Sequence, residues 1–472
     1  MRALLAATAS APLAGCKPTS TGAPEDPTVT FEPGGPLPWI NWAGNQACLP
    51  ADRWAPGSEE ELVGRIARSH ARLRPVGAGH SFTPLVPTDG AIVSTDALSG
   101  IVPSDRPALT RDEAEAAVEV WAGTRLHQLG PLLWARGRAL SNLPDIDYQT
   151  IAGATATSTH GTGVTFGSLS SLVEGLALVT PSGDLLECDR DRHPEIFDAA
   201  RCSLGALGVI TRLTLRTQPA YRLRERTRLE PLEPLLEEIE TRAAAHRHFE
   251  FIAFPHTTVA AVTETDETTE GDGASRDLDP EGARRLRDAY RWVGGIPGMG
   301  DFIYDQLLRL SAQEFESARS GPAYAVLAHE RQTRFREMEY TVPADAGPAC
   351  LREIMAVARA GHPIVMPVEY RYVKGDDVWL SMFHGRDGCS ISIHQFADED
   401  HRAYFDAIEP IFWKYDGRPH WGKLHSLGAK ELSTLYPRFG DFAALRAELD
   451  PTGKMSNDHL RRLFDLETAR SA

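Results

Sequence analysis

Cysteine is scarce in this sequence, and no metal-binding cysteine pattern is present. The 472 residues contain 6 cysteines, none in a C-x-x-C pair, which disfavours a zinc knuckle or a thioredoxin-like site. Wide spacing is typical of free thiols rather than of a disulfide framework, which small secreted domains need and a large core does not. The cysteines are Cys16, Cys48, Cys188, Cys202, Cys350 and Cys389.

Positive charge is also in short supply. There are 49 Lys and Arg residues against 65 Asp and Glu residues, and the net charge is -16. A surface this acidic repels a phosphate backbone, so we expect no nucleic-acid partner. A nucleotide cofactor remains compatible, because backbone amides can hold phosphates without basic side chains. The length indicates two or three domains.

Long apolar runs are missing, and only the first residues suggest export. Arg2 precedes a short Ala/Leu-rich stretch that resembles the h-region of a secretory signal. Its Leu-Ala-Gly-Cys16 ending either resembles a bacterial lipobox, which predicts a lipid anchor at Cys16, or is a chance match in Ala-rich sequence. Residues 1–38 then form a signal, lipobox and tether. A cofactor-loaded enzyme is expected to use the twin-arginine route, yet Arg2 has no arginine partner. The location is therefore open between export, as a lipoprotein or periplasmic protein, and the cytoplasm.

The dinucleotide-binding fingerprint G-x-G-x-x-G is absent as well. A predicted strand at 73–76 leads into Gly77-Ala78-Gly79, but Phe82 stands where the third glycine belongs. This disfavours a nicotinamide dehydrogenase. Backbone N–H groups of such a loop can still close around a phosphate, because glycine permits positive φ.

Two further stretches of small residues repeat this chemistry. Residues 151–163 are mostly Gly, Ala and Thr, so the backbone can lie close to a flat ligand while hydroxyls donate hydrogen bonds. Residues 203–211 follow the same pattern. The alternative is a tightly packed turn between sheet and helix.

Strand-like and helical runs alternate from 39 to 219, which predicts layered α/β packing. From 220 to 472, strand-like runs such as 365–373, 378–382 and 389–394 predict a second, α+β domain. We expect a polar loop over 263–279.

The order of these motifs resembles the FAD-linked oxidases of the vanillyl-alcohol-oxidase type, in particular the sugar-1,4-lactone oxidase branch that includes arabinonolactone and gulonolactone oxidases. The resemblance runs from Asn41-Trp-Ala-Gly-Asn45 through the three small-residue stretches to the C-terminal half. There it is carried by Phe249-Glu-Phe251, Met338-Glu-Tyr340, Glu369-Tyr-Arg371, Cys389-Ser-Ile-Ser-Ile-His-Gln395, His420-Trp-Gly-Lys423 and Asp450-Pro-Thr-Gly-Lys-Met-Ser-Asn457. It implies an α+β, two-domain FAD-binding (PCMH-type) fold. The α/β FAD domain spans 39–219, and the substrate domain at 220–472 is built on an antiparallel sheet with helices.

The resemblance implies FAD, with a covalent bond from His80 to the flavin 8α-methyl carbon. The alternative is noncovalent FAD with His80 packing the loop. Pro144 lies at a position that sets access of dioxygen in relatives, and proline there favours an oxidase over a dehydrogenase. The alternative is that Pro144 is an ordinary turn proline. For His160 a turn-stabilising role competes with a ligand contact. The cofactor-binding residues so implied are Gly77, Ala78, Gly79, His80, Ser81, Pro144, Ala152, Gly153, Thr157, His160, Gly161, Gly205 and Ile210.

On the substrate side, alternation places Glu369 and Arg371 on the same face of one strand. Ser392 and His394 likewise share a face of their own strand. The resemblance makes the Glu-x-Arg pair a substrate clasp rather than a surface ion pair. His394 is an alternative general base or a structural histidine. Lys423 is expected to reach the flavin or the substrate and to stabilise the reduced, anionic flavin.

Together these features predict an FAD-dependent oxidase, like D-arabinono-1,4-lactone oxidase, that acts on a carbinol of a sugar-1,4-lactone. Hydride passes to flavin N5, and dioxygen becomes hydrogen peroxide. The alternatives are an alditol oxidase acting on a polyol, or a dehydrogenase that uses a quinone or cytochrome. No metal is expected.

Overall fold

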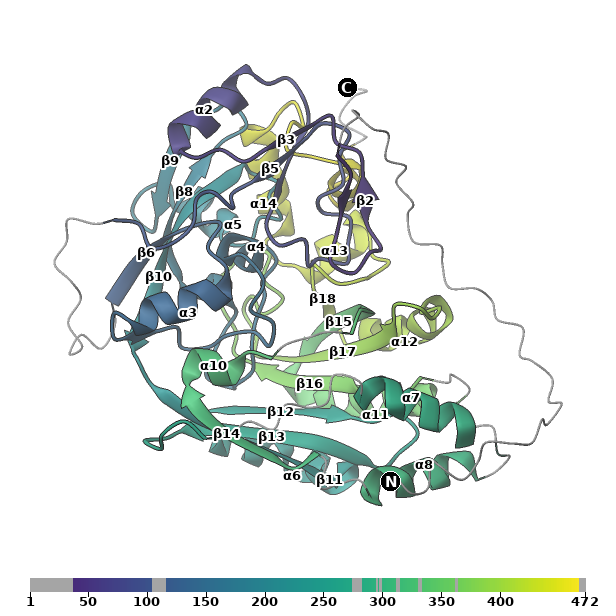
Figure 1. Ribbon diagram of the computed structural model, residues 1–472. Coiled ribbons are helices and arrows are strands. Elements are labelled where there is room, and N and C mark those ends of the chain that lie inside the picture. The colour runs from purple at the N-terminus through teal and green to yellow at the C-terminus, as the bar shows by residue number, and fades with distance from the viewer. Residues whose placement is uncertain are drawn as a thin grey trace.

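The structure is a computed structural model. It describes residues 37–103, 116–273, 282–293, 296, 299–310, 315–329, 333–360 and 364–466. The predicted signal, lipobox and tether, including Cys16 and almost all of the tether, lie outside these residues. Figure 1 shows two halves: small sheets with helices from the N-terminal part of the chain, and one large sheet from the C-terminal part.

The N-terminal half contains a parallel and an antiparallel sheet. The three-stranded parallel sheet has the order β3 (Asp52–Trp54), β5 (Ala91–Ser94) and β4 (Leu73–Val76). The antiparallel sheet runs β6 (Ala116–Trp121), β10 (Val209–Pro219), β8 (Val173–Val179) and β9 (Leu185–Asp189), and β7 (Arg138–Ala139) also pairs with β10. A small ladder joins β1 (Trp39–Ile40) and β2 (Ala47–Cys48). The helical segments are α2 (Glu59–Arg68), α3 (Leu126–Trp134), α4 (Ile151–Ala156), η1 (Leu169–Leu172) and α5 (Pro194–Ala200).

The C-terminal half is built on one eight-stranded sheet. Its order is β14 (Ser317–Pro322), β11 (Arg222–Pro231), β13 (Val259–Glu267), β12 (His248–Ala253), β16 (Val368–Val373), β17 (Gly388–Phe396), β15 (Phe335–Pro343) and β18 (Arg418–Pro419). The helical segments are α6 (Leu232–Ala245), α7 (Gly282–Val293), α8 (Gly300–Leu310), α10 (Ala323–Leu327), η2 (Ala344–Ala346), α11 (Gly347–Arg359), α12 (Arg402–Lys414), α13 (Ala429–Leu435), α14 (Phe439–Leu449) and α15 (Asp458–Leu463).

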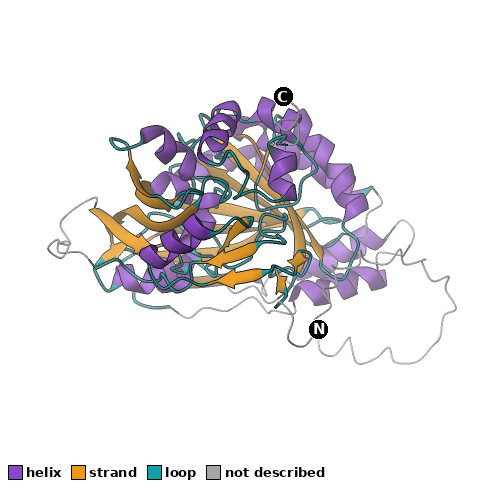
Figure 2. Ribbon diagram, turned by 90° about the horizontal axis from the view of Figure 1, so that it is seen from above, coloured by secondary structure: helices purple, strands orange, loops and turns teal. Residues whose placement is uncertain are grey.

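One face of the large sheet packs on helices, and alternation along each strand separates that face from the other. On β15, Tyr340 stacks on Phe412 of α12 with 4.8 Å between ring centroids. The neighbouring positions Glu337 and Glu339 therefore point to the opposite face, which lies towards the N-terminal half. The helices accordingly gather on the outside while strands run through the middle of the molecule (Figure 2).

Two sequence expectations were wrong in this half. Residues 263–267 belong to strand β13 rather than to a loop, because all of them pair with β11 and residues 263–265 also pair with β12. Residues 378–382 form turns rather than a strand, although Val378, Leu380 and Met382 are fully buried. Asp376 holds these turns, since its carboxylate accepts hydrogen bonds from the Val378 amide and the Ser381 hydroxyl.

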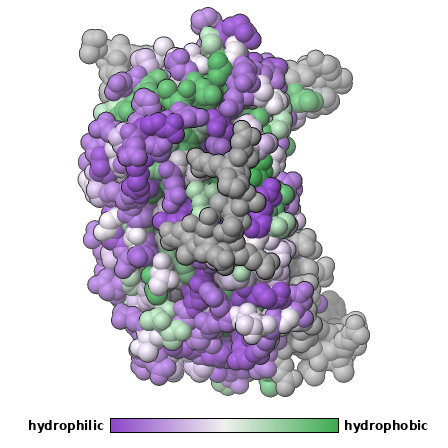
Figure 3. Space-filling view, turned by 90° about the vertical axis from the view of Figure 1, so that its left-hand side faces the viewer, coloured by the Kyte–Doolittle hydropathy of each residue, from purple (hydrophilic) through white to green (hydrophobic). Residues whose placement is uncertain are grey.

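The surface and the cysteines say little about the function of the protein. The face on the left of Figure 1 is mainly hydrophilic, with hydrophobic side chains gathered towards its upper end (Figure 3). Among the described residues, no helix is both long enough and apolar enough to cross a membrane. Cys48, Cys188, Cys202, Cys350 and Cys389 are free thiols.

The predicted boundary at 219/220 falls between the last strand of the N-terminal sheets and the first strand of the large sheet. The chain nevertheless returns to the N-terminal half directly after β18, where the Phe82 amide donates to the Gly422 carbonyl over 2.7 Å. Met455 packs in the core of the parallel sheet, and the Leu73 amide donates to the Lys454 carbonyl over 2.7 Å. The two halves thus share a C-terminal segment.

Arg74, in β4, joins three segments at this junction. Its buried guanidinium donates to the carbonyls of Leu85 (2.7 Å), Leu204 (2.6 Å) and Gly205 (3.1 Å), and also to that of Met455. Burial lowers the pKa of Arg74 to about 9, so the group remains charged near neutral pH. Arg74 therefore fixes the strand that enters the glycine loop against the 203–211 stretch.

We expect Arg74→Met to lower the free energy of unfolding by about 3 kcal/mol, because buried carbonyls would lose their donors. Denaturant unfolding measures this loss. The matched control is Arg72→Met, which removes only exposed ion pairs with Asp89 and Asp458 and should cost less than about 1 kcal/mol. Equal losses of unfolding free energy in the two variants would show that the hydrogen bonds of Arg74 do not stabilise the junction between the halves.

Candidate functional site

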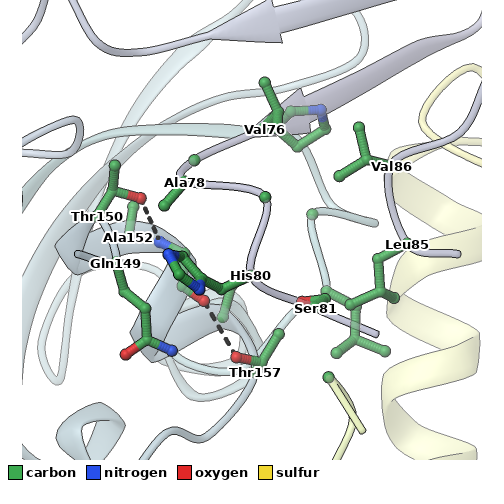
Figure 4. Close-up of a pocket in the computed structure, with 18 of the residues that line it drawn as sticks. Val76, Ala78, His80, Ser81, Leu85, Val86, Gln149, Thr150, Ala152 and Thr157 are labelled. Atoms are coloured by element: carbon green, nitrogen blue, oxygen red, sulfur yellow. Dashed lines mark hydrogen bonds between the residues drawn. The ribbon is translucent and has the colours of Figure 1, made fainter. Parts of the chain in front are cut away.

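A cavity lies between the glycine loop, helix α4 and the 203–210 segment. It is open to solvent on one side, and the empty space within it and at its mouth amounts to about 1230 Å³. Figure 4 shows Ala78, His80 and Ser81 on the loop that curves around it, with Thr150, Ala152 and Thr157 at and beside α4. From the C-terminal half, Glu337, His420, Gly422 and Lys423 also line it.

Glycine is required where the walls approach each other. A Cβ at Gly77 would collide with the Thr150 hydroxyl, which already accepts a hydrogen bond from the Gly153 amide at 3.2 Å. Gly205 has a φ of +66°, and a Cβ there would meet Pro75 and the Arg74 guanidinium. The small residues therefore bring bare backbone to the cavity wall, as a flat, phosphate-bearing cofactor needs.

His80 projects from the glycine loop beside Trp42. The two rings stack with 5.3 Å between centroids, and Tyr148 lies 6.4 Å from the imidazole. Burial lowers the pKa of His80 to about 4, assisted by the positive charges of Lys423 and Arg125. The imidazole is therefore neutral at physiological pH, which is the form able to act as a nucleophile.

Most of the predicted cofactor residues line this cavity, and three do not. His160 is turned away because its ring bonds the Gly161 carbonyl (2.8 Å) and Glu339 (2.7 Å). Gly161 lines a smaller polar cavity with Arg371, to which the neighbours of Pro144 also contribute. The cofactor contacts of Pro144, His160 and Gly161 stay predictions. The residues that do line the main cavity are Gly77, Ala78, Gly79, His80, Ser81, Ala152, Gly153, Thr157, Gly205 and Ile210.

The predicted substrate residues meet on the large sheet. The register places Glu369 opposite Ser392, and Ser392 opposite Glu339 on the next strand. His394 lies opposite Glu337 in the same way. Residues paired across antiparallel strands project to the same face. Strands β16, β17 and β15 thus present one polar row towards the N-terminal half.

Arg371 sits between two carboxylates. It donates to Glu369 at 2.5 Å and to Glu250 of β12 at 2.7 Å. Burial opposes its charge, but the two carboxylates outweigh burial and raise the pKa of Arg371. Arg371 is a permanent cation that fixes the orientation of Glu369. Glu250 was missed in the sequence, although Phe249-Glu-Phe251 places a charge in an otherwise apolar strand.

Glu337 links the sheet to the main cavity. It accepts a hydrogen bond from Lys423 Nζ, and its other oxygen lies 3.5 Å from His394 Nε2. Burial opposes ionisation of Glu337, but Lys423 and His394 outweigh it and lower the pKa to about 2. Lys423 itself lies 5.3 Å above the Phe82 ring. One carboxylate oxygen of Glu337, one of Glu369 and one ring nitrogen of His394 all lie within 4.8 Å of one another.

Glu339 is the second carboxylate missed on β15. It pairs with His160, and its other oxygen lies 3.9 Å from Lys423. Burial again opposes ionisation, but His160 lowers the pKa of Glu339 well below its usual value. The signal was present in the sequence, since Glu337 and Glu339 alternate with Met338 and Tyr340 in a fully buried strand. Charges in such a strand indicate a site rather than a core.

His420 completes the wall. The Gly422 amide donates to its Nδ1 at 2.9 Å, so the neutral ring carries its proton on Nε2. Burial lowers the pKa of His420 to about 4 against the opposing effect of Glu339. Beside it, the fully buried Trp421 donates to the Leu380 carbonyl at 2.6 Å and fixes the loop that carries Lys423.

A glycine-lined cavity for a flat nucleotide cofactor, next to a wall of paired carboxylates, imidazoles and a lysine, defines the protein as an FAD-linked oxidoreductase. The residues present fit FAD: bare backbone can contact the pyrophosphate, and Lys423 supplies a cation where a reduced flavin carries negative charge.

Comparisons with known proteins give the same class. A family model described as D-arabinono-1,4-lactone oxidase matches residues 213–463, and one described as FAD binding domain matches residues 53–189. An L-gulono-1,4-lactone dehydrogenase of Mycobacterium tuberculosis is 37% identical over 90% of this chain and 99% of its own length. An L-gulonolactone oxidase of Bos taurus is 31% identical over 90% of this chain and 97% of its own length.

The chain belongs to the D-arabinono-1,4-lactone oxidase family, and its cofactor is FAD. A solved solvent-stable cholesterol oxidase matches with a TM-score of 0.75 at 18% identity, over 90% of this chain and 97% of that chain. This likeness supports the fold alone, and it confirms the predicted two-domain FAD-binding architecture.

Proposed function

We propose that this protein oxidises a carbinol of a sugar-1,4-lactone and passes the electrons to dioxygen. The observation that carries the proposal is the convergence of Glu369, His394 and Glu337 within 4.8 Å, beside a cavity that Lys423 shares with the glycine loops. Bound FAD would supply the hydride acceptor for the carbinol carbon. The residues of this chain have to bind the sugar, orient its hydroxyl and remove the proton.

His394 is the group best arranged to remove that proton. Its Nδ1 lies 3.0 Å from the Pro367 carbonyl and must donate to it. The neutral ring therefore keeps a lone pair on Nε2, which faces Glu337. A carboxylate beside the ring stabilises the imidazolium formed when Nε2 takes the hydroxyl proton.

Glu369 and Arg371 orient the substrate. Arg371 holds one oxygen of Glu369 and so fixes the plane of a carboxylate whose oxygens are hydrogen-bond acceptors for sugar hydroxyls. A carboxylate fixed by a guanidinium loses little freedom on binding, which favours one geometry of the carbinol. Ser392, opposite Glu369 on β17, adds a hydroxyl to the same wall.

A dehydrogenase is the second candidate for the electron acceptor, because the 37% identical relative is named a dehydrogenase. The bovine relative is named an oxidase, and Pro144 favours dioxygen. A polyol substrate is the alternative to a lactone, since the wall of carboxylates and hydroxyls offers hydrogen bonds suited to either.

An assay in air over a panel of aldono-1,4-lactones and alditols, with peroxide as the readout, tests this proposal. We expect an aldono-1,4-lactone to be oxidised with peroxide release. Reduction of an artificial dye without release of peroxide would show that the protein is a dehydrogenase rather than an oxidase. Activity on alditols alone would replace the lactone by a polyol.

The same assay on His394→Asn probes the proton acceptor. Its kcat/KM should fall by about 100-fold or more. His246→Asn is the matched control, because His246 pairs with Asp266 at the end of α6, outside the site, and its loss should leave the rate unchanged.

We further propose that FAD is attached covalently through His80. The support is the neutral, partly buried imidazole that lines the cavity and stacks on Trp42. We expect acid precipitation to leave flavin on the wild-type protein but to release it from His80→Ala. Release from the wild type would refute the bond and leave FAD binding intact. His127→Ala, a nearby histidine on the other side of Tyr148, is the control and should retain flavin.

We also propose that Cys16 is a lipid anchor, which the Leu-Ala-Gly-Cys16 ending and the tether to residue 38 support. With bacterial expression, mass spectrometry of the mature N-terminus should find a lipidated Cys16, and Cys16→Ser should leave the membrane fraction. A mature chain that keeps Met1 and carries no lipid would overturn the anchor and favour the cytoplasm.

A further inference from the structure

A row of ionisable groups crosses the junction between the two halves. It runs from His160, next to α4, to Glu339, Lys423, Glu337 and finally His394. The contacts are His160 to Glu339 at 2.7 Å, Glu339 to Lys423 at 3.9 Å, the Lys423–Glu337 hydrogen bond, and Glu337 to His394 at 3.5 Å. The two carboxylates are buried, with 4% of each residue exposed.

His160 binds the Glu339 oxygen that lies away from Lys423. Its Nδ1 faces the Gly161 carbonyl, and its Nε2 lies 2.7 Å from the Glu339 carboxylate. The other Glu339 oxygen is 3.9 Å from Lys423 Nζ, whereas Glu337 accepts a hydrogen bond from that ammonium. Glu337 is therefore the hydrogen-bonded partner of Lys423.

Lysine needs such a partner to act at a defined point. Its ammonium is carried on four flexible carbons, and a lone Lys423 would sample many positions across the cavity. Glu337 is fixed by its strand, since β15 pairs with β17 along nine positions. A hydrogen bond from a rigid, ionised carboxylate restricts the ammonium to the cavity wall and leaves two of its N–H groups for flavin or substrate.

We propose that Glu337 is a positioning residue that holds Lys423 at the flavin edge and, through its own negative charge, limits how far Lys423 stabilises the reduced flavin. This inference rests on the proposed function, because it assigns a role to Lys423 at that flavin. It makes two separable statements. The position of Lys423 depends on the length of the side chain at position 337. The midpoint potential of the flavin depends on the charge of that side chain.

Glu337→Gln tests the charge. Removing a negative charge beside the cavity leaves more net positive charge near the reduced, anionic flavin, so the midpoint potential should become more positive. Because the neutral amide holds the ammonium less tightly, kcat should fall at the same time by about 100-fold. A more positive potential with a slower reaction is not expected from loss of folding alone.

Glu337→Asp tests the position. Aspartate keeps the charge but withdraws it by one methylene, so the potential should stay close to wild type while kcat falls. Glu409→Gln is the matched control. Glu409 is equally buried, on α12, and accepts hydrogen bonds from Tyr340 and the Ser426 amide on the opposite face of the sheet. Its substitution should change neither the potential nor kcat.

Dye-equilibrated redox titration of each flavin-loaded variant measures the potential independently of turnover. An unchanged potential in Glu337→Gln, or a shift of equal size in Glu409→Gln, would overturn the role of Glu337. A wild-type protein that turns over no lactone and no polyol, but whose Glu337→Gln potential still shifts, would refute the proposed function and leave the effect of the Glu337 charge on the flavin standing.

Discussion

Burial of charge on one face of the eight-stranded sheet is the constraint on which the site depends. A carboxylate removed from water is costly unless a cation or several donors compensate it. Here Arg371 compensates Glu369 and Glu250, while Lys423 and His160 compensate Glu337 and Glu339. Apart from Glu369 and Arg371, which share strand β16, each pair requires a fixed distance between two segments that are far apart in the sequence. The electrostatics therefore dictate how the strands and the loop that carries Lys423 must lie.

The N-terminal half obeys a complementary constraint, because its cavity wall is made of backbone. Gly77 and Gly205 leave no room for a Cβ, so at these points the wall has no side chain with which to hold itself in place. Arg74 supplies rigidity there, by donating to the carbonyls of Leu85 and Leu204. A rigid wall of bare amides suits a cofactor whose phosphates need donors rather than cations, in keeping with the acidic composition.

The sequence was informative wherever the relevant pattern is local. Alternation alone placed Glu369 with Arg371, and the glycine loop alone indicated a phosphate-binding turn. The partners of those residues could not be predicted, because Glu337 meets Lys423 only through the register of β15 and the loop that follows β18. The prediction of a strand at 378–382 was wrong for a related reason. Its apolar residues are buried by the elements around them and not by pairing with another strand.

The ion pairs also bear on how far the two halves are independent. The sequence divides near residue 219, yet His160 from the first half contacts Glu339 in the second, and the 450–457 segment returns to pack under β4. Separating the halves would break the His160–Glu339 contact, and a carboxylate left buried without its partner costs about 3–5 kcal/mol. A hinge between rigid domains is therefore disfavoured. Because Lys423 lies between Glu337 and Glu339 at this junction, any ligand that moves the ammonium also alters the charge balance that joins the halves. Substrate binding and the electrostatic environment of the cofactor are coupled through that one side chain.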